Sequence, residues 1–171
     1  MSLQAALLRG VNLGSRKVIM TELKAVCEGA GCTDVKTLLA SGNVVLNAKV
    51  KGEALEKKLE AAILKGLGLK TDVFVRNHAE LEAIIAANPF KAFAKKDPGH
   101  FVVCFLRTPP SAAERAAMEA NSGPEEVKPG KDCLYITYPD GQARSKLKLP
   151  KLGTSRNWNT VTKLAALTAG E

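Results

Sequence analysis

Two short β-type runs joined by a tight turn constrain the fold of this chain most. Val35–Ala40 and Val44–Leu46 are separated only by Ser41-Gly42-Asn43, and glycine supplies the positive φ that a type II′ hairpin turn needs first. Apolar residues with helical spacing lie on either side of this hairpin, and further β-type runs lie outside them. The resulting order, β-α-β-β-α-β, is that of a split βαβ, or ferredoxin-like, unit.

This first unit covers residues 1–76. Its predicted strands are Leu3–Leu8, the two runs of the hairpin, and Thr71–Arg76. One predicted helix begins at Thr21 and the other covers about Gly52–Leu67. Residues 77–99 follow as a connecting helix, His78–Ala87, and a linker containing Pro89, Pro98 and Gly99, because X-Pro steps disfavour helix.

The pattern begins again in residues 100–171, which read as a second β-α-β-β-α unit. Predicted strands at Phe101–Leu106, Glu126–Lys128 and Cys133–Tyr138 surround a helix at Ser111–Asn121, and a last helix follows Gly153. We therefore predict an α+β protein, a tandem of two ferredoxin-like (split βαβ) units with antiparallel sheets, the second lacking its last strand. The order of elements supports this tandem, without a repeat at the level of residues.

The last quarter of the chain is strongly basic. The formal net charge is +8, and no Asp or Glu lies between Asp140 and Glu171. The cations of this stretch are Arg144, Lys146, Lys148, Lys151, Arg156 and Lys163. A basic surface favours acidic partners, here nucleic acid, nucleotides or phosphorylated metabolites. A solvated basic loop is the alternative for each lysine taken singly.

Polar donors gather where the last helix is predicted to begin. Arg156, Asn157 and Asn159 flank this start, where free backbone amides favour an anion. Lys146 belongs to a stretch in which basic and apolar side chains alternate, as in an edge strand or an extended arm with its lysines on one side. Trp158 falls on the apolar face of the helix, which favours core packing.

A second candidate site lies at the rim of the first sheet. In a split βαβ unit the loop after the first strand and the turn between the second and third strands share one end of the sheet, which predicts an anion or amide pocket formed by Arg9, Asn12, Ser41 and Asn43. The alternative is that these residues serve only the turns, because asparagine and glycine tolerate turn backbone.

Signatures of catalysis, metal or cofactor are not found. The loop after the first strand is neither a P-loop nor Gly-x-Gly-x-x-Gly, the four cysteines have no zinc spacing and read as buried reduced thiols, and the two histidines have no nucleophile nearby in sequence. We assign no catalytic residue, no metal site and no cofactor. The short apolar runs predict a cytoplasmic protein without a membrane segment, and the oligomeric state stays open.

Several motifs resemble the bacterial domain-of-unknown-function family 1697. They are Ala6-Leu7-Leu8-Arg9-Gly10-Val11-Asn12, Ser41-Gly42-Asn43-Val44-Val45, Asn88-Pro89-Phe90, Ser145-Lys146-Leu147 and Thr154-Ser155-Arg156-Asn157-Trp158-Asn159-Thr160-Val161. Ser155 departs from the family's usual alanine. The resemblance implies a compact intracellular α+β protein and carries no established activity.

Three functions remain open at this level. The leading hypothesis is a binding protein for a phosphate-bearing ligand, either nucleic acid or a nucleotide-like metabolite, at the basic terminal quarter. The second is an enzyme acting on a small phosphorylated or amide-bearing substrate at the rim of the first sheet. The third is a structural or partner-binding module, in which the motifs are turns and caps.

Overall fold

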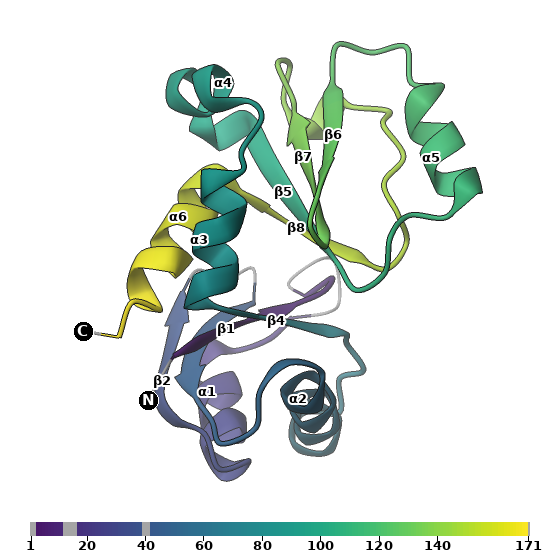
Figure 1. Cartoon of the computed structure of the whole chain (residues 1–171). Helices are drawn as coiled ribbons and strands as arrows, with labels where there is room; N and C mark the ends of the chain where they lie inside the picture. Colours follow the sequence, from purple (N-terminus) through teal and green to yellow (C-terminus); the bar gives the residue numbers. More distant parts are fainter. Residues whose placement is uncertain (1–2, 12–16, 39–41, 171) are drawn as a thin grey trace. The chain divides into compact units, whose positions relative to one another are not determined.

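The computed structural model describes residues 3–11, 17–38 and 42–170. The chain forms two compact units, Met1–Glu82 with Leu164–Glu171, and Ala83–Lys163 (Figure 1). Each unit contains a four-stranded sheet whose paired strands are all antiparallel. The protein therefore belongs to the α+β class, as predicted. None of the helices in the described part of the chain is long and apolar enough to span a membrane.

The first unit has the strand order β2-β3-β1-β4. Its elements are β1 (Gln4–Leu8), α1 (Met20–Gly29), β2 (Thr33–Leu38), β3 (Asn43–Asn47), α2 (Gly52–Leu67), β4 (Val73–Asn77), the start of α3 (His78–Ala86) and the end of α6 (Trp158–Leu167). The strand β1 lies inside the sheet, between β3 and β4. Its continuous run of alanine and leucine suits this place, because all five of its residues are buried.

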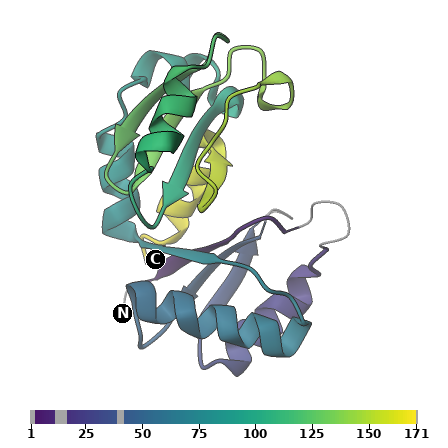
Figure 2. The ribbon, with the colours of Figure 1, turned by 90° about the vertical axis from the view of Figure 1, so that its right-hand side faces the viewer.

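Helices α1 and α2 cover the same face of this sheet (Figure 2). Leu23 of α1 and Leu55 and Leu59 of α2 pack against Leu8 of β1 and Val75 of β4. The leucines recur at helical spacing and so lie on one face of each helix, whereas the inward residues of the strands alternate with outward ones. The two sets of side chains form a single apolar core. This packing fixes the rim of the sheet where the candidate residues lie.

The outer edge of β4 is covered by two glutamates from α2. Glu60 Oε2 accepts from Val73 N and Glu56 Oε2 accepts from Val75 N, each at 2.8 Å. The glutamates are four residues apart on the helix, and the amides are two apart on the strand, so one helix face serves both donors. The β4 edge is thereby closed to pairing with another strand.

The second unit has the strand order β6-β7-β5-β8. Its elements are the end of α3, α4 (Lys91–Lys96), β5 (Phe101–Leu106), α5 (Ala112–Glu119), β6 (Glu126–Gly130), β7 (Cys133–Thr137), β8 (Gly153–Asn157) and the start of α6, with 3₁₀ turns at Pro98–His100 and Gln142–Arg144. Only the 3₁₀ turn at Gln142–Arg144 interrupts the irregular chain of residues 138–152, all of which are described.

The prediction that the second unit lacks its last strand is wrong. β8 pairs with β5 along its whole length, from Val102↔Asn157 to Leu106↔Gly153. The sequence Gly-Thr-Ser-Arg-Asn has no apolar alternation, so it reads as a loop leading to a helix cap. Main-chain hydrogen bonds to the buried strand β5 make it a strand, and β propensity depends strongly on such context.

The two faces of the second sheet are covered differently. On one face the ring of Phe101 stacks on Tyr135, with centroids 6.4 Å apart, and contacts Trp158 at 5.0 Å. On the other face Leu147 and Leu149 of the irregular chain pack against the core around Cys104, Leu134, Ile136 and Tyr138. An extended segment therefore takes the place that α2 has in the first unit.

Candidate functional site

The end of β1 and the turn before β3 meet at one rim of the first sheet. Leu8 N donates to Gly42 O at 2.9 Å, and Leu7 pairs with Asn43 in the strand register. Of the four residues predicted at this rim, Asn12 and Ser41 lie outside the described residues. The remaining two, Arg9 and Asn43, are both at this end of the sheet.

Arg9 is held by Thr71 and Asp72, the two residues that precede β4. Its Nη1 atom lies 3.4 Å from Asp72 Oδ2, its backbone N donates to Asp72 O at 2.9 Å, and its carbonyl accepts from Thr71 Oγ1 at 2.7 Å. The two charged side chains are 38% and 36% exposed. A half-exposed ion pair is worth about 0–1 kcal/mol, so another anion competes with Asp72 at little cost.

Asn43 is fully buried, and its side chain serves the hairpin. Nδ2 donates to Leu38 O at 2.9 Å and so links the start of β3 to the end of β2. A buried amide bonded in this way stabilises the pairing of the two strands, because an unsatisfied buried donor costs about 1–3 kcal/mol. The geometry of Asn43 is therefore that of a structural residue.

The basic segment, residues 144–151, has alternating exposure in the second unit. Lys146 and Lys148 are exposed, whereas Leu147 and Leu149 between them are half-buried against the core. This is the alternation expected of extended backbone, in which successive side chains point to opposite sides. Arg144 and Lys151 are exposed at its two ends. Four cations thus face solvent from eight residues.

The end of the basic segment is pinned by Glu114 of α5. Glu114 Oε1 accepts from Ser111 N and Oε2 accepts from Lys151 N, both at 2.9 Å, and Ser111 Oγ accepts from Glu114 N at 3.1 Å. Ser111 and Glu114 form a capping box at the helix start. The backbone donors of Ser111 and Lys151, in that order, lower the pKa of Glu114.

Arg156 points into the protein rather than toward solvent. It is 7% exposed, and its Nη1 atom donates to Thr154 Oγ1 at 2.7 Å and to Ser155 O at 2.8 Å. Loss of hydration on burial lowers the pKa of its guanidinium to about 10, so it remains charged at neutral pH. The buried guanidinium therefore helps to fix the backbone and side chains of β8.

The neighbours of Arg156 have separate places at the start of α6. Asn157 Oδ1 accepts from Thr160 N at 2.9 Å and so caps the helix. Trp158 is half-buried against Phe101, while Asn159 is exposed. Of the predicted residues in the second unit, Lys146 and Asn159 therefore face solvent, Arg156 is buried, and Asn157 uses its side-chain oxygen in the cap.

The Arg-Asn pair of β8 recurs at the end of β4. Arg76 pairs with Ala5 of β1 as Arg156 pairs with Val103 of β5. Arg76 Nη1 donates to the carbonyl of the preceding residue at 2.9 Å, as Arg156 does at 2.8 Å. This repeat was missed in the sequence, although Arg-Asn stands directly before a predicted helix in both halves.

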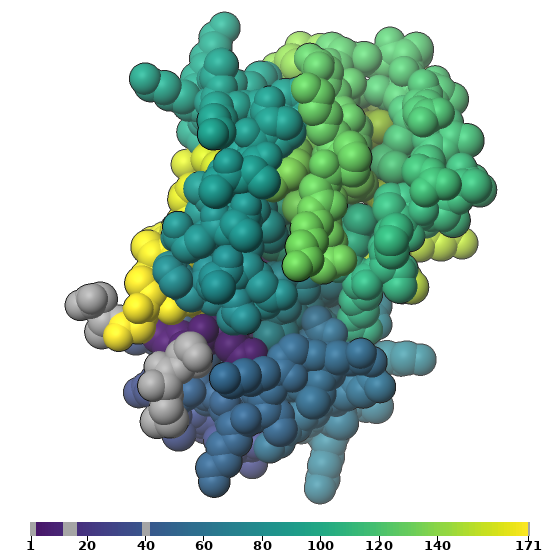
Figure 3. Space-filling view, viewed as in Figure 1, coloured from purple at the N-terminus to yellow at the C-terminus, as the bar shows by residue number. Residues whose placement is uncertain are grey.

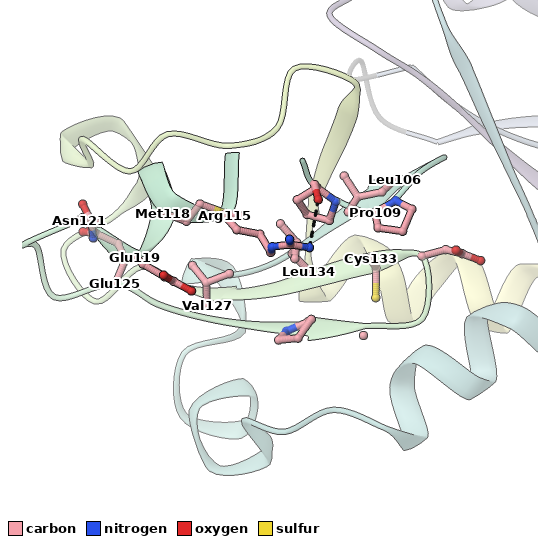
Figure 4. A pocket seen from close by; sticks show the side chains of 14 residues that line it. Leu106, Pro109, Arg115, Met118, Glu119, Asn121, Glu125, Val127, Cys133 and Leu134 are labelled. Carbon is pink, nitrogen blue, oxygen red and sulfur yellow. Dashed lines mark hydrogen bonds between the residues drawn. The ribbon is translucent and has the colours of Figure 1, made fainter. Parts of the chain in front are cut away.

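A cavity of about 560 Å³ lies between α5 and the β6–β7 hairpin of the second unit (Figure 4). Figure 3 shows this hairpin, in light green, at the surface of the unit. The residues that line the cavity, among them Arg115, Glu119 and Glu125, were not predicted from the sequence. The available signal was composition: α5 is rich in alanine, whose side chain fills little space.

The four cysteines are buried free thiols. Burial raises the pKa of Cys27 to about 12 and raises the pKa of Cys32 and Cys104 as well. Because the thiolate is the reactive form, Cys27, Cys32 and Cys104 are poor nucleophiles and poor metal ligands at neutral pH.

Comparison with known proteins places the chain in a family. The chain is similar to the solved structure of the conserved bacterial protein SP0830 from Streptococcus pneumoniae, with 22% sequence identity, a TM-score of 0.78 and coverage of 98% of both chains. At this identity the likeness concerns the fold. No curated protein shows significant similarity to the sequence. The family model described as "Protein of unknown function (DUF1697)" matches residues 1–135, so the chain belongs to this family.

Proposed function

We propose that the protein binds the phosphate backbone of a nucleic acid through the basic segment. The observation that carries this proposal is the alternation of Lys146 and Lys148, which face solvent, with Leu147 and Leu149, which pack on the core. The leucines hold the segment in place, so the lysines present their charges from an anchored backbone. Pre-placed cations lose less side-chain and loop freedom on binding than a mobile tail does.

The distribution of charge along the chain also favours the basic segment as the binding surface. The second unit, residues 83–163, contains 13 Lys and Arg against 7 Asp and Glu, a formal +6, whereas the first unit contains 12 against 10, a formal +2. Most of the chain's +8 therefore belongs to the unit that presents the basic segment. A surface charge of this sign attracts polyanions and accelerates their association.

The geometry favours a polymer over a small nucleotide. Extended backbone rises about 3.3 Å per residue, so Lys146 and Lys148 are spaced about 6.6 Å apart along an open surface. A small ligand needs a concave site that encloses it. The cavity under α5 is lined by three carboxylates and one guanidinium, which disfavours phosphate. A chain of phosphates needs no enclosure and gains from a row of cations.

Recognition is expected to be independent of base sequence. Base stacking needs exposed aromatic rings. Phe74, Phe101, Phe105, Tyr135 and Tyr138 are buried. The half-buried rings of Phe90, Phe93 and Trp158 all pack on Phe101. The rim of the first sheet supports an enzyme less well, because Asn43 is buried in its hairpin and Arg9 is paired with Asp72.

Two finer structural expectations belong to this proposal. The strand order β2-β3-β1-β4, with helices between β1 and β2 and between β3 and β4, supports a ferredoxin-like first unit, and the matching order β6-β7-β5-β8 supports a tandem. The buried free thiols support a reducing, cytoplasmic location.

The test is a titration of fluorescein-labelled oligothymidylate, followed by anisotropy between about 50 and about 200 mM salt. The variant Lys146→Ala/Lys148→Ala is compared with Lys24→Ala/Lys65→Ala, which removes the same charge from exposed helix positions of the first unit. We expect only the first variant to weaken binding, and its plot of log K against log salt to be shallower by about 1.4, which is two phosphate contacts. Equal losses in the two variants, or none, would refute the proposal.

A further inference from the structure

Helix α5 lies over its sheet without burying a residue. None of its eight residues is buried, whereas α2 buries Leu55, Leu59 and Ile63. A helix that covers a sheet ordinarily packs a broad apolar stripe against it, with few voids larger than a water molecule. The stripe of α5 is built largely from alanine, and Met118 alone reaches the core as a large apolar side chain. The helix therefore roofs a space that its own side chains do not fill.

The space under α5 is the cavity of about 560 Å³, and its lining lies wholly within the second unit. This volume falls in the range of sites that bind small molecules, about 300–1,000 Å³. Val127 and Leu134 form the strand side of the cavity, and Met118 lies on the helix side (Figure 4). Such a lining provides an apolar slot between two layers of secondary structure.

The two ends of the cavity differ in polarity. Glu119 and Glu125 lie at one end, Leu106 and Pro109 lie toward the other, and Leu134 lies between them (Figure 4). Asp132 belongs to the end with Leu106, because its backbone oxygen accepts from Leu106 N at 2.9 Å. Asn121 Nδ2 donates to Glu125 Oε1 at 3.0 Å, which holds this carboxylate at its place. A slot with apolar side chains along its length and a pair of carboxylates at one end has the polarity of a site for an amphipathic cation.

The single cation of the lining does not neutralise these carboxylates by direct pairing. Arg115 and Glu119 are four residues apart on α5, a spacing that allows a helix ion pair, yet no ion pair joins them among the described residues. Arg115 instead donates to Pro110 O at 3.4 Å, away from the acidic end (Figure 4).

The charge of the lining is opposite to that of its surroundings. The second unit has a formal charge of +6, but the cavity contains Glu119, Glu125 and Asp132 against Arg115 alone. A site lined by one sign of charge concentrates ligands of the other sign. A phosphate-bearing ligand, such as the proposed partner of the basic segment, is therefore not expected to bind in this cavity.

We propose that the cavity under α5 binds a small organic cation, an amine with an apolar body. The body fills the slot between Met118, Val127 and Leu134, and the ammonium group lies at the carboxylates of Glu119 and Glu125. The site is separate from the basic segment, and binding here does not require the proposed nucleic-acid function.

The test is an NMR titration of the ¹⁵N-labelled full chain with 2-phenylethylamine. The matched probes are 3-phenylpropionate, which replaces the ammonium by a carboxylate, and 2-phenylethanol, which is neutral. We expect shifts centred on the amides of Met118, Val127 and Leu134, and an affinity for the amine at least about tenfold above that for the carboxylate. Equal affinity for the three probes, shifts centred elsewhere, or no shift at millimolar amine would overturn the proposal.

Adjacent glutamates provide a matched control. Glu125 lines the cavity, whereas Glu126 is exposed and lies outside its lining. The variant Glu119→Gln/Glu125→Gln is expected to weaken amine binding about tenfold or more while keeping the fold, and Glu126→Gln is expected to bind as the wild type does. An unchanged affinity in the double variant, or an equal loss in Glu126→Gln, would show that the carboxylates of the cavity do not hold the amine.

Discussion

Asn77 and Asn157 cap the helices that follow the last strand of each unit with the same side-chain atom. Asn77 Oδ1 accepts from Glu80 N at 2.8 Å, and Asn157 Oδ1 accepts from Thr160 N at 2.9 Å. In the first unit Glu80 Oε1 also accepts from Asn77 N at 2.9 Å, which completes a capping box. The same cap geometry therefore occurs twice in this chain, each time where an Arg-Asn pair ends a strand and a helix begins.

Replacement of either asparagine by alanine is expected to destabilise the protein. Asn77→Ala and Asn157→Ala each remove a cap, which costs about 1 kcal/mol. The controls Asn77→Asp and Asn157→Asp keep the acceptor and place a negative charge at a helix start, where it is favourable. Urea unfolding followed by circular dichroism measures the difference. An alanine variant as stable as its aspartate counterpart would contradict a capping role at that position.

Gly42 is expected to tolerate no side chain. Its φ is +82°, and an added Cβ would come within 2.5 Å of Val11 Cγ2 and 3.0 Å of Leu8 Cβ. Gly42→Ala therefore combines a left-handed backbone, about 1–2 kcal/mol, with overpacking, about 1–3 kcal/mol. Gly68→Ala is the control, because Gly68 also has a positive φ but nothing within 4 Å of an added Cβ. Unfolding midpoints that fall equally in the two variants would rule out the steric contribution.

Buried strands and amphipathic helices were predictable from the sequence. Helix α2 was predicted over about Gly52–Leu67 and has these bounds, because its leucines recur at helical spacing. The apolar run at Phe101–Leu106 likewise forms β5. β8 was not predictable, because its polar residues become a strand only through main-chain bonds to β5.

The candidate site was predictable where side-chain direction follows from backbone periodicity. The alternation of Lys146 and Lys148 with leucine predicted lysines on one side, and the structure exposes them. The burial of Arg156 was not predictable, since it depends on Thr154 Oγ1 and Ser155 O lying where the guanidinium folds back. The cavity was equally hidden, because it depends on how far α5 stands from the sheet.

A variant of Arg156 distinguishes a structural role of this residue from a role in binding nucleic acid. Arg156→Met keeps much of the side-chain volume and removes the charge from a residue that is 7% exposed. Because its guanidinium is bonded within the protein, we expect oligothymidylate affinity to change less than about twofold, well within the 1.4 kcal/mol that corresponds to a tenfold change. Anisotropy titration beside Lys146→Ala/Lys148→Ala makes the comparison. A loss in Arg156→Met as large as in the double variant would place Arg156 in the binding surface.

Glu114, which accepts a hydrogen bond from the basic segment at Lys151, is expected to make the thermal stability of the protein depend on pH in the acid range. Its folded pKa is lowered, first by the Ser111 backbone donor and then by that of Lys151. A carboxylate with a lowered folded pKa stabilises the protein above its unfolded pKa, about 4.3, and this stabilisation disappears as pH falls through the lower folded pKa. We therefore expect wild type to melt at a higher temperature than Glu114→Gln near neutral pH, and the gap to narrow below about pH 4.3.

The control for this pH dependence is Ser111→Ala, which removes the cap hydroxyl, about 1 kcal/mol, and keeps both backbone donors to Glu114. Its deficit relative to wild type is expected to change far less across the same pH range. Melting temperatures measured by calorimetry from neutral to acid pH compare the three proteins. If the gap between wild type and Glu114→Gln stayed constant with pH, the two backbone donors would not be bonded preferentially to the ionised carboxylate, and the anchoring of the basic segment at Lys151 would need another cause.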